Sequence, residues 1–189
     1  FKQKTAYEML RSLVGSEMCI RDRRSNGELV AAFGNFVNRT LAFAARYLDG
    51  RVPGEVGQVP KDAEHAGRAE TTLQKIGDNL EQHRYRAGLE EMMSYARLCN
   101  EFFSLREPWR TRKEDPADCA TAIATCIHAV HCLAVMSYPF LPNAARRLLR
   151  MLNLPDGPVR WQRPAPLPAG HALGQPEILF PKLEPGCVE

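Results

Sequence analysis

One amphipathic stretch, residues 28–48, constrains the fold of this chain more than any other segment. At the helical period of about 100° per residue, its apolar side chains fall on one broad arc. The arc is formed by Leu29, Val30, Phe33, Phe36, Val37, Leu41, Phe43, Ala44, Tyr47 and Leu48. Asn35, Arg39 and Arg46 share the opposite side, with Asn35 and Arg39 as i,i+4 neighbours. Such a wide, aromatic-rich face buries against other helices, so the stretch predicts a helix within a bundle.

Four more segments carry helical patterns. They span residues 61–81, 84–105, 116 to just before Tyr138, and 142–152. Pro108 ends the third helix because the residue before a proline is disfavoured in the α conformation. Asp115 is the expected N-cap of the next helix, with Pro116 in its first turn. The sequence therefore predicts an all-α fold, an antiparallel bundle of about five helices.

The two ends of the chain differ from this middle part. Residues 1–23 resemble a peptide obtained when sequencing-adapter DNA is translated at the broken end of an assembled gene, so we expect a non-native leader. Residues 24–153 then form the helical domain, and residues 154–189 form an extended, proline-rich tail that packs on it. Ile178, Leu179 and Phe180 are expected to form a short strand at most.

Composition narrows the function only a little. A net charge of +3 is too small to indicate nucleic-acid binding by itself. No run of uncharged apolar residues reaches the length of about 18 that a membrane span needs, so no membrane partner is expected. The six cysteines include no Cys-x-x-Cys pair, and no secretory signal precedes them. This favours a reducing, cytoplasmic location.

Three motifs, in order along the chain, resemble one known family. They read GNFVNR at residues 34–39, EPW at 107–109 and ILFPKLE at 178–184. Together they resemble the anticodon-binding domain of methionyl-tRNA synthetases, which are class I aminoacyl-tRNA synthetases, and the resemblance spans residues 24–184. It implies a helical bundle that recognises the CAU anticodon of methionine tRNAs, initiator and elongator.

The resemblance also implies roles for individual residues. Trp109 would stack on an anticodon base, Pro108 would shape its loop, and Asn35 and Arg39 would contact base edges. Arg46 is a weaker candidate for a base or phosphate contact. Without the resemblance, the better interpretation of the polar side chains is a solvated helix face, and that of the tryptophan is a plug at the end of the bundle. A non-enzymatic helical protein-interaction module is therefore the alternative function.

No catalytic machinery is recognisable in the sequence. The His-x-Gly-His and Lys-Met-Ser-Lys-Ser-like elements of class I synthetases are missing, so ATP and magnesium, with zinc as a further candidate, would belong to a catalytic domain absent from this chain. The segment CIHAVHC at residues 126–132 places His128 and Cys132 at i,i+4 and invites a metal-dependent enzyme as a third hypothesis. Helical phase separates His131 from Cys132 by about 100°. We therefore expect no metal site and no cofactor in this chain.

Overall fold

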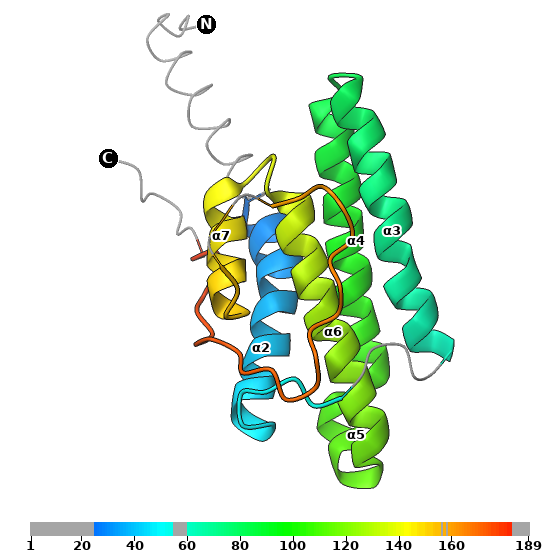
Figure 1. Ribbon diagram of the computed structural model, residues 1–189, viewed down its shortest axis with the longest axis vertical. Coiled ribbons are helices and arrows are strands. Elements are labelled where there is room, and N and C mark those ends of the chain that lie inside the picture. Colours follow the sequence, from blue (N-terminus) through cyan, green and yellow to red (C-terminus); the bar gives the residue numbers. More distant parts are fainter. Residues whose placement is uncertain (1–24, 55–59, 156, 158, 183–189) are drawn as a thin grey trace, which may run out of the picture.

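The computed structural model describes residues 25–54, 60–155, 157 and 159–182, and they form a bundle of roughly parallel and antiparallel helices (Figure 1). The elements are η1 (Ser25–Gly34), α2 (Asn35–Tyr47), α3 (Pro60–Glu81), α4 (Tyr85–Arg106), α5 (Pro108–Glu114), α6 (Pro116–Ser137) and α7 (Pro142–Met151). η1 runs directly into α2, so the described residues form five helices besides the short α5, and the predicted all-α fold class is confirmed. Within the described residues the only β-type pairing is an isolated antiparallel bridge between Arg51 and Ala172.

Helix α6 is the centre of the core. It packs against α2, α3, α4, α5 and α7, and most of its side chains are buried. By length and composition alone this helix could cross a membrane, but 83% of its apolar window is buried inside the bundle. Burial against the surrounding helices thus explains why α6 is so apolar, as is usual for a core helix.

The start of the first helix departs from the expected pattern. Residues 25–34 are wound as a π-helix, and regular α-helix begins only at Asn35. Because a π-helix has more residues per turn, the arc drawn at 100° per residue does not hold before Gly34. The other end differs as well: Tyr47, expected on the buried arc, keeps 38% of its surface exposed.

Helix α5 is an addition to the predicted elements. The sequence analysis treated the polar run after Pro108 as a connection, whereas the structure folds it into a seven-residue helix. Glu107 adopts φ 42°, which ends α4 and turns the chain, and Pro108 then occupies the first turn of α5. The predicted cap of α6 is confirmed, since the Asp115 carboxylate accepts a hydrogen bond from the Asp118 backbone N–H at 3.1 Å.

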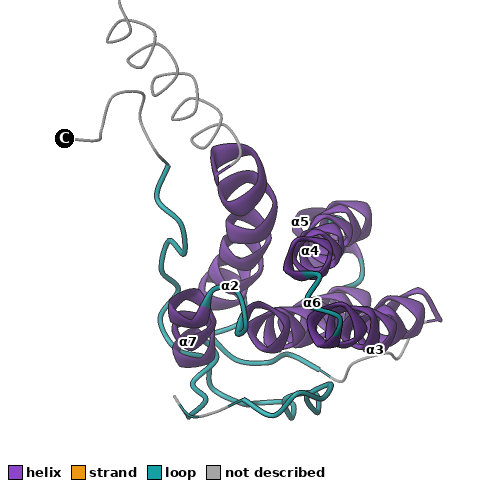
Figure 2. Ribbon diagram, turned by 90° about the horizontal axis from the view of Figure 1, so that it is seen from above, coloured by secondary structure: helices purple, strands orange, loops and turns teal. Residues whose placement is uncertain are grey.

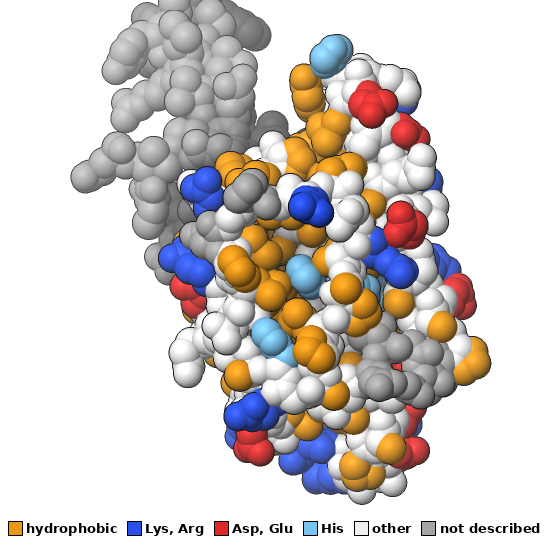
Figure 3. All heavy atoms as spheres, viewed as in Figure 1, with side chains coloured by type: hydrophobic (Ala, Val, Ile, Leu, Met, Phe, Trp, Pro, Cys, Tyr) orange, Lys and Arg blue, Asp and Glu red, His pale blue; other side chains and the backbone are white. Residues whose placement is uncertain are grey.

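The described part of the tail, residues 154–155, 157 and 159–182, crosses the bundle in extended form on the side of α3, α6 and α7 (Figures 1 and 2). Arg147 of α7 holds its far end by donating to the Leu179 and Ile178 carbonyls, both at 2.7 Å, and to Glu177 at 2.6 Å. Phe180 reaches Phe33 at a ring distance of 5.5 Å. No strand forms here. Figure 3 shows this side of the molecule, with hydrophobic side chains across its middle.

Figure 2 places most of the tail on one side of the bundle and the pair α4–α5 on the other. Residues 1–24 lie outside the described residues, so the expected leader stays a prediction. The division into a helical domain (residues 24–153) and a tail (residues 154–189) also stays a prediction.

Candidate nucleic-acid interface

Helices α2 and α4 bring a row of polar side chains together on the side away from the tail. The Arg39 guanidinium donates from Nη1 to Asn100 Oδ1 at 2.9 Å and to Ser104 Oγ at 3.1 Å. Asn35, one turn before Arg39, is exposed and approaches the same Asn100 oxygen at 3.5 Å. The two helices thereby fix the position of Arg39 while the Asn35 amide stays accessible.

The start of α5 supplies an aromatic side chain next to this row. Trp109 is 48% exposed, and its ring lies 6.3 Å from that of the buried Phe103. The Arg39 guanidinium carbon lies 4.5 Å from the Phe103 ring centroid and 5.9 Å from that of Trp109. Pro108, which is buried, sets the start of α5 and hence the place of the indole. We call Asn35, Arg39, Asn100, Phe103 and Trp109 the arginine–tryptophan face.

Arg39 uses only some of its hydrogen-bond donors within this face. Among the described residues, Nη1 is its only hydrogen-bonded nitrogen, and no carboxylate lies within ion-pair distance. Burial lowers the pKa of this guanidinium, yet an arginine remains cationic at neutral pH. A half-buried cation with unused donors, beside a half-exposed indole, suits the edges and flat faces of unpaired bases.

A buried ionic cluster supports the corner from which Trp109 projects. Arg106, at the end of α4, donates from Nη2 to Asp118 Oδ1 of α6 at 2.7 Å and to Asp62 Oδ2 of α3 at 3.4 Å, and its Nε lies 3.2 Å from Asp62 Oδ1. Asp62 is fully buried; burial raises its pKa and the neighbouring Arg106 lowers it. Three helices are thus tied together immediately before Glu107 and α5.

The structure therefore brings Asn35, Arg39 and Trp109 together, with Pro108 beneath the tryptophan. Arg46 is exposed and lies further along α2, 5.3 Å from the Tyr47 ring, without a contact to Trp109 among the described residues. Sequence reasoning missed the α4 residues that contact Arg39, which are Asn100, Phe103 and Ser104. The i,i+4 spacing of Asn100 and Ser104 was the only available signal for them.

The segment considered for a metal is part of the α6 core. His128 and Cys132 are buried and approach each other, Nε2 to Sγ, at 3.7 Å. Burial lowers the pKa of His128 to about 4 and raises that of Cys132 to about 12, so both are neutral near pH 7. No group of three or more His, Cys, Asp or Glu side chains is placed to hold a metal ion anywhere in the described part of the chain.

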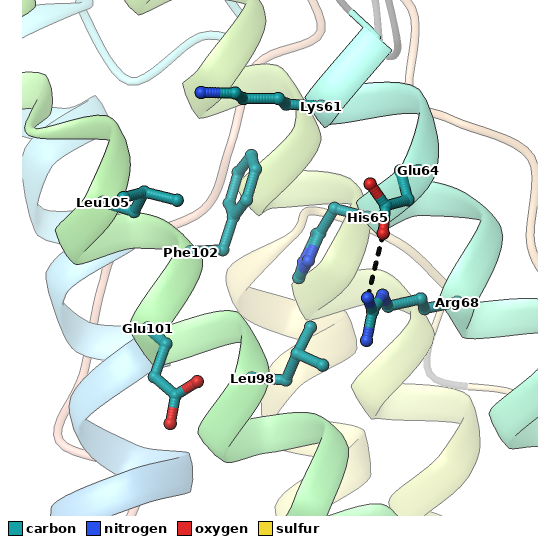
Figure 4. A pocket seen from close by; sticks show the side chains of 8 residues that line it. All are labelled: Lys61, Glu64, His65, Arg68, Leu98, Glu101, Phe102 and Leu105. Carbon is teal, nitrogen blue, oxygen red and sulfur yellow. Dashed lines mark hydrogen bonds and ion pairs between the residues drawn. The ribbon is translucent and has the colours of Figure 1, made fainter.

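A hollow lies between α3 and α4, apart from the arginine–tryptophan face. It is an open groove of about 670 Å³, drawn in Figure 4, lined by Lys61, Glu64, His65, Arg68, Leu98, Glu101, Phe102 and Leu105. The buried His65 ring stacks on Phe102 at 4.2 Å, and Glu64 pairs with Arg68 at 2.9 Å. Burial, with Arg68 adding to it, lowers the His65 pKa to about 4. Since its lining comes only from α3 and α4, the groove is separate from Trp109 and Arg39.

An all-α bundle that presents amide, guanidinium and indole groups on one face falls in the class of helical RNA-binding domains. The chain belongs to the family described as the anticodon binding domain of methionyl tRNA ligase, whose model matches residues 52–188. It is 38% identical over 162 residues to the methionine–tRNA ligase of Methanopyrus kandleri, covering 85% of this chain and 24% of the relative. It is also 38% identical to the methionine–tRNA ligase of Pyrococcus abyssi, covering 85% of this chain and 22% of that relative.

Solved structures agree with this family. The chain resembles the apo form of Mycobacterium tuberculosis methionyl-tRNA synthetase with a TM-score of 0.76 and 28% identity, over 86% of this chain and 34% of that one. The same enzyme bound by methionyl-adenylate gives a TM-score of 0.72 and 29% identity, over 84% and 32%. The chain thus spans about a quarter to a third of these proteins. Membership of this family does not favour the protein-interaction alternative.

Proposed function

We propose that this chain reads the CAU anticodon of methionine tRNAs, initiator and elongator, through its arginine–tryptophan face. Trp109 is the stacking platform for one unpaired base, Asn35 and Arg39 contact base edges, and Pro108 holds the start of α5. Arg46 reaches a base or phosphate at the far end of α2. Membership of the family supports tRNA as the partner, and the geometry of the arginine–tryptophan face supports the roles proposed for its residues.

One observation carries this assignment. The Arg39 guanidinium is fixed between Asn100, Phe103 and Trp109 and keeps unused donors without a carboxylate partner among the described residues. A cation held in this way is complementary to the acceptor groups on base edges. The adjacent half-exposed indole provides a flat apolar surface, and stacking of a base on it is worth about 1–3 kcal/mol.

We further propose that the parent protein is a cytoplasmic methionine–tRNA ligase that activates methionine with ATP. The relatives carry that name, and a solved relative binds methionyl-adenylate. ATP and Mg²⁺ are assigned to a catalytic domain that this chain does not include, with Zn²⁺ as a further candidate there, and that domain is also a partner of the present one. On its own the chain is expected to support no methionine-dependent exchange between ATP and pyrophosphate.

The test is a fluorescence titration with two anticodon stem-loops, one carrying CAU and one a scrambled triplet, at fixed salt. The chain has two tryptophans, and Trp161 is 41% exposed, so the titration uses a Trp161→Phe background in which Trp109 alone reports. We expect quenching that prefers the CAU loop by tenfold or more. Because phosphate contacts are strong in dilute salt and carry no sequence information, the preference is measured near physiological ionic strength.

The control replaces Trp109 itself. Trp109→Leu, read out by competition against a labelled CAU loop, is expected to weaken binding by about fivefold to a hundredfold, as the loss of one stacked base predicts. Equal and weak binding of both loops by the unsubstituted chain would contradict anticodon reading and return the interaction module as the better explanation.

A further inference from the structure

The exposed end of α2 carries an aromatic side chain that the proposed function does not use. Tyr47, its last residue, is 38% exposed, and its ring lies 4.9 Å from the buried Phe43 ring. The Arg112 guanidinium of α5 lies over the same ring at 4.0 Å, and that of Arg46 lies at 5.3 Å. Tyr47 thus combines a partly exposed aromatic side chain with two nearby cations.

Arg112 differs from its neighbour on the same short helix. Arg110 is neutralised by Glu107 at 2.9 Å and Glu114 at 3.3 Å. Arg112 has no carboxylate within ion-pair distance in the described parts of the chain, and its buried Nε has no hydrogen-bond partner there. Its charge is held against an aromatic ring instead, which leaves it able to attract an anion or stack on a base.

Buried rings connect Tyr47 to the arginine–tryptophan face. Phe43 and Phe103, which are 8% and 3% exposed, lie 6.3 Å apart, and Trp109 lies 6.3 Å beyond Phe103. The row therefore has a buried middle and an exposed ring at each end. A guanidinium accompanies both exposed rings, Arg39 beside Trp109 and Arg112 beside Tyr47.

We infer that Tyr47 and Arg112 form a second stacking position, which takes an unpaired nucleobase neighbouring the base on Trp109. Arg112 lies one turn of α5 after Trp109, a step of about 5 Å along the helix, so one single-stranded loop can reach both. Unstacked bases of RNA loops pack on aromatic rings and on guanidinium planes, and both surfaces are present here. This inference rests on the proposed anticodon-loop function, which names only the first position.

Arg46 completes the second position from the solvent side. It is exposed and sits further from the Tyr47 ring than Arg112 does, so it can move to the phosphate of the incoming nucleotide while Arg112 keeps its place. Stacking is tolerant of base identity because every base has a flat face. The second position therefore adds affinity for an open loop, and the CAU preference stays with Asn35, Arg39 and Trp109.

The experiment combines a protein substitution with removal of single bases from the RNA. CAU stem-loops carrying an abasic site at each loop position in turn are titrated against the unsubstituted chain and against Tyr47→Leu and Tyr47→Phe. Tyr47→Leu is expected to weaken binding of the complete loop by about fivefold to a hundredfold, and Tyr47→Phe to leave it within twofold. For one abasic position, Tyr47→Leu and the unsubstituted chain should bind equally, because the stacked base is already gone.

Matched controls separate stacking from general effects. Tyr85→Leu removes another exposed tyrosine, at the α3–α4 turn at the opposite end of the bundle from α5, and should change nothing (Figure 1). Arg112→Gln should lower affinity severalfold, whereas Arg110→Gln should not, because Arg110 is already neutralised. Arg112→Gln also tests the site independently if Tyr47→Leu proves too unstable to titrate.

The outcomes are distinguishable. Without a CAU preference in the unsubstituted chain, the proposed function itself is wrong. If that preference is present and Tyr47→Leu binds like the unsubstituted chain, only the second stacking position is wrong. A Tyr47→Leu loss that is the same for every abasic loop would also overturn it, because Tyr47 would then merely support α5.

Discussion

Arg39 on the arginine–tryptophan face and Arg147 beneath the tail are both partly buried, yet they use their donors differently. Arg147 engages each of its three nitrogens, with Glu177 and two tail carbonyls at 2.6–2.7 Å. Arg39 engages Nη1 alone among the described residues, and with the neutral acceptors Asn100 and Ser104. A guanidinium with all nitrogens bonded stabilises the fold, whereas one with unused donors is available to a ligand.

A third arginine extends this comparison and gives the largest expected effect. Arg106→Met would leave the fully buried Asp62 without its cation, and breaking a buried ion pair from one side costs about 3–5 kcal/mol of unfolding free energy. Urea denaturation measures the loss. Adding Asp62→Leu to the same chain should recover part of it, because the uncompensated charge is removed. A loss below about 1 kcal/mol for Arg106→Met alone would contradict the structural role.

The next effect tests the tail side. Arg147→Met removes three hydrogen bonds and strands the carbonyl of Leu179, whose residue is 2% exposed. We expect about 2–3 kcal/mol less unfolding free energy and an unchanged affinity for the CAU stem-loop. Arg150→Met, at an exposed site on the same helix, is the matched control and should be nearly neutral. A clear loss of RNA affinity in Arg147→Met would break the division between the two sides.

The opposite pattern is expected on the arginine–tryptophan face. Arg39→Gln keeps a polar side chain but removes the charge and most donors, and hydrogen bonds to charged groups contribute about 1.5–3 kcal/mol. Affinity for the CAU loop should fall by about tenfold to a hundredfold, with the unfolding free energy within about 1 kcal/mol of the unsubstituted chain. Arg39→Lys should recover little, because an ammonium group cannot reproduce the planar fork. Equal losses of folding and binding would contradict an interface role.

These contrasts also show what the sequence could and could not predict. The long helices were predictable because burial against a common core imposes a helical period, and Asn35 and Arg39 share a face because they share a helix. Helix α5 was not, since seven residues are too few to display a period and its proline was interpreted as an end rather than a start. The π-helical start likewise broke the assumed 100° step.

Contacts between residues far apart in the sequence could not be predicted from any local sequence pattern. Asn100 lies 61 residues from its partner Arg39, and nothing near it in the sequence marks it as a neighbour. Tyr47 was assigned to the buried arc because the period cannot tell that the bundle ends before it. The carbonyls that Arg147 binds belong to an irregular tail, whose path depends on tertiary packing alone.

The smallest expected effect uses acid to probe the tail side. Burial lowers the pKa of His128 and His131 on α6, and of His65, to about 4, against about 6.5 in an unfolded chain. The unfolded state therefore binds more protons between these values, and stability present above pH 6.5 is lost as the pH falls towards 4. Near pH 5.5 each histidine contributes a slope of about 1 kcal/mol per pH unit.

His131→Gln isolates one of these contributions at the tail, because the backbone of Ala165 in the tail acts on His131 and partly opposes the larger effect of burial on its pKa. When the unfolding free energy is measured from pH 7 to 5.5, its slope near pH 5.5 should be smaller in this variant by about 1 kcal/mol per pH unit, the contribution of one histidine. Proton uptake by His128 and His131 on unfolding is thus a property of the tail side of the bundle. CAU binding over the same pH range should depend on the arginine–tryptophan face, whose cation does not titrate there. If binding fell in step with the histidine titration, the two sides would be coupled, and the distinction drawn from Arg39 and Arg147 would fail.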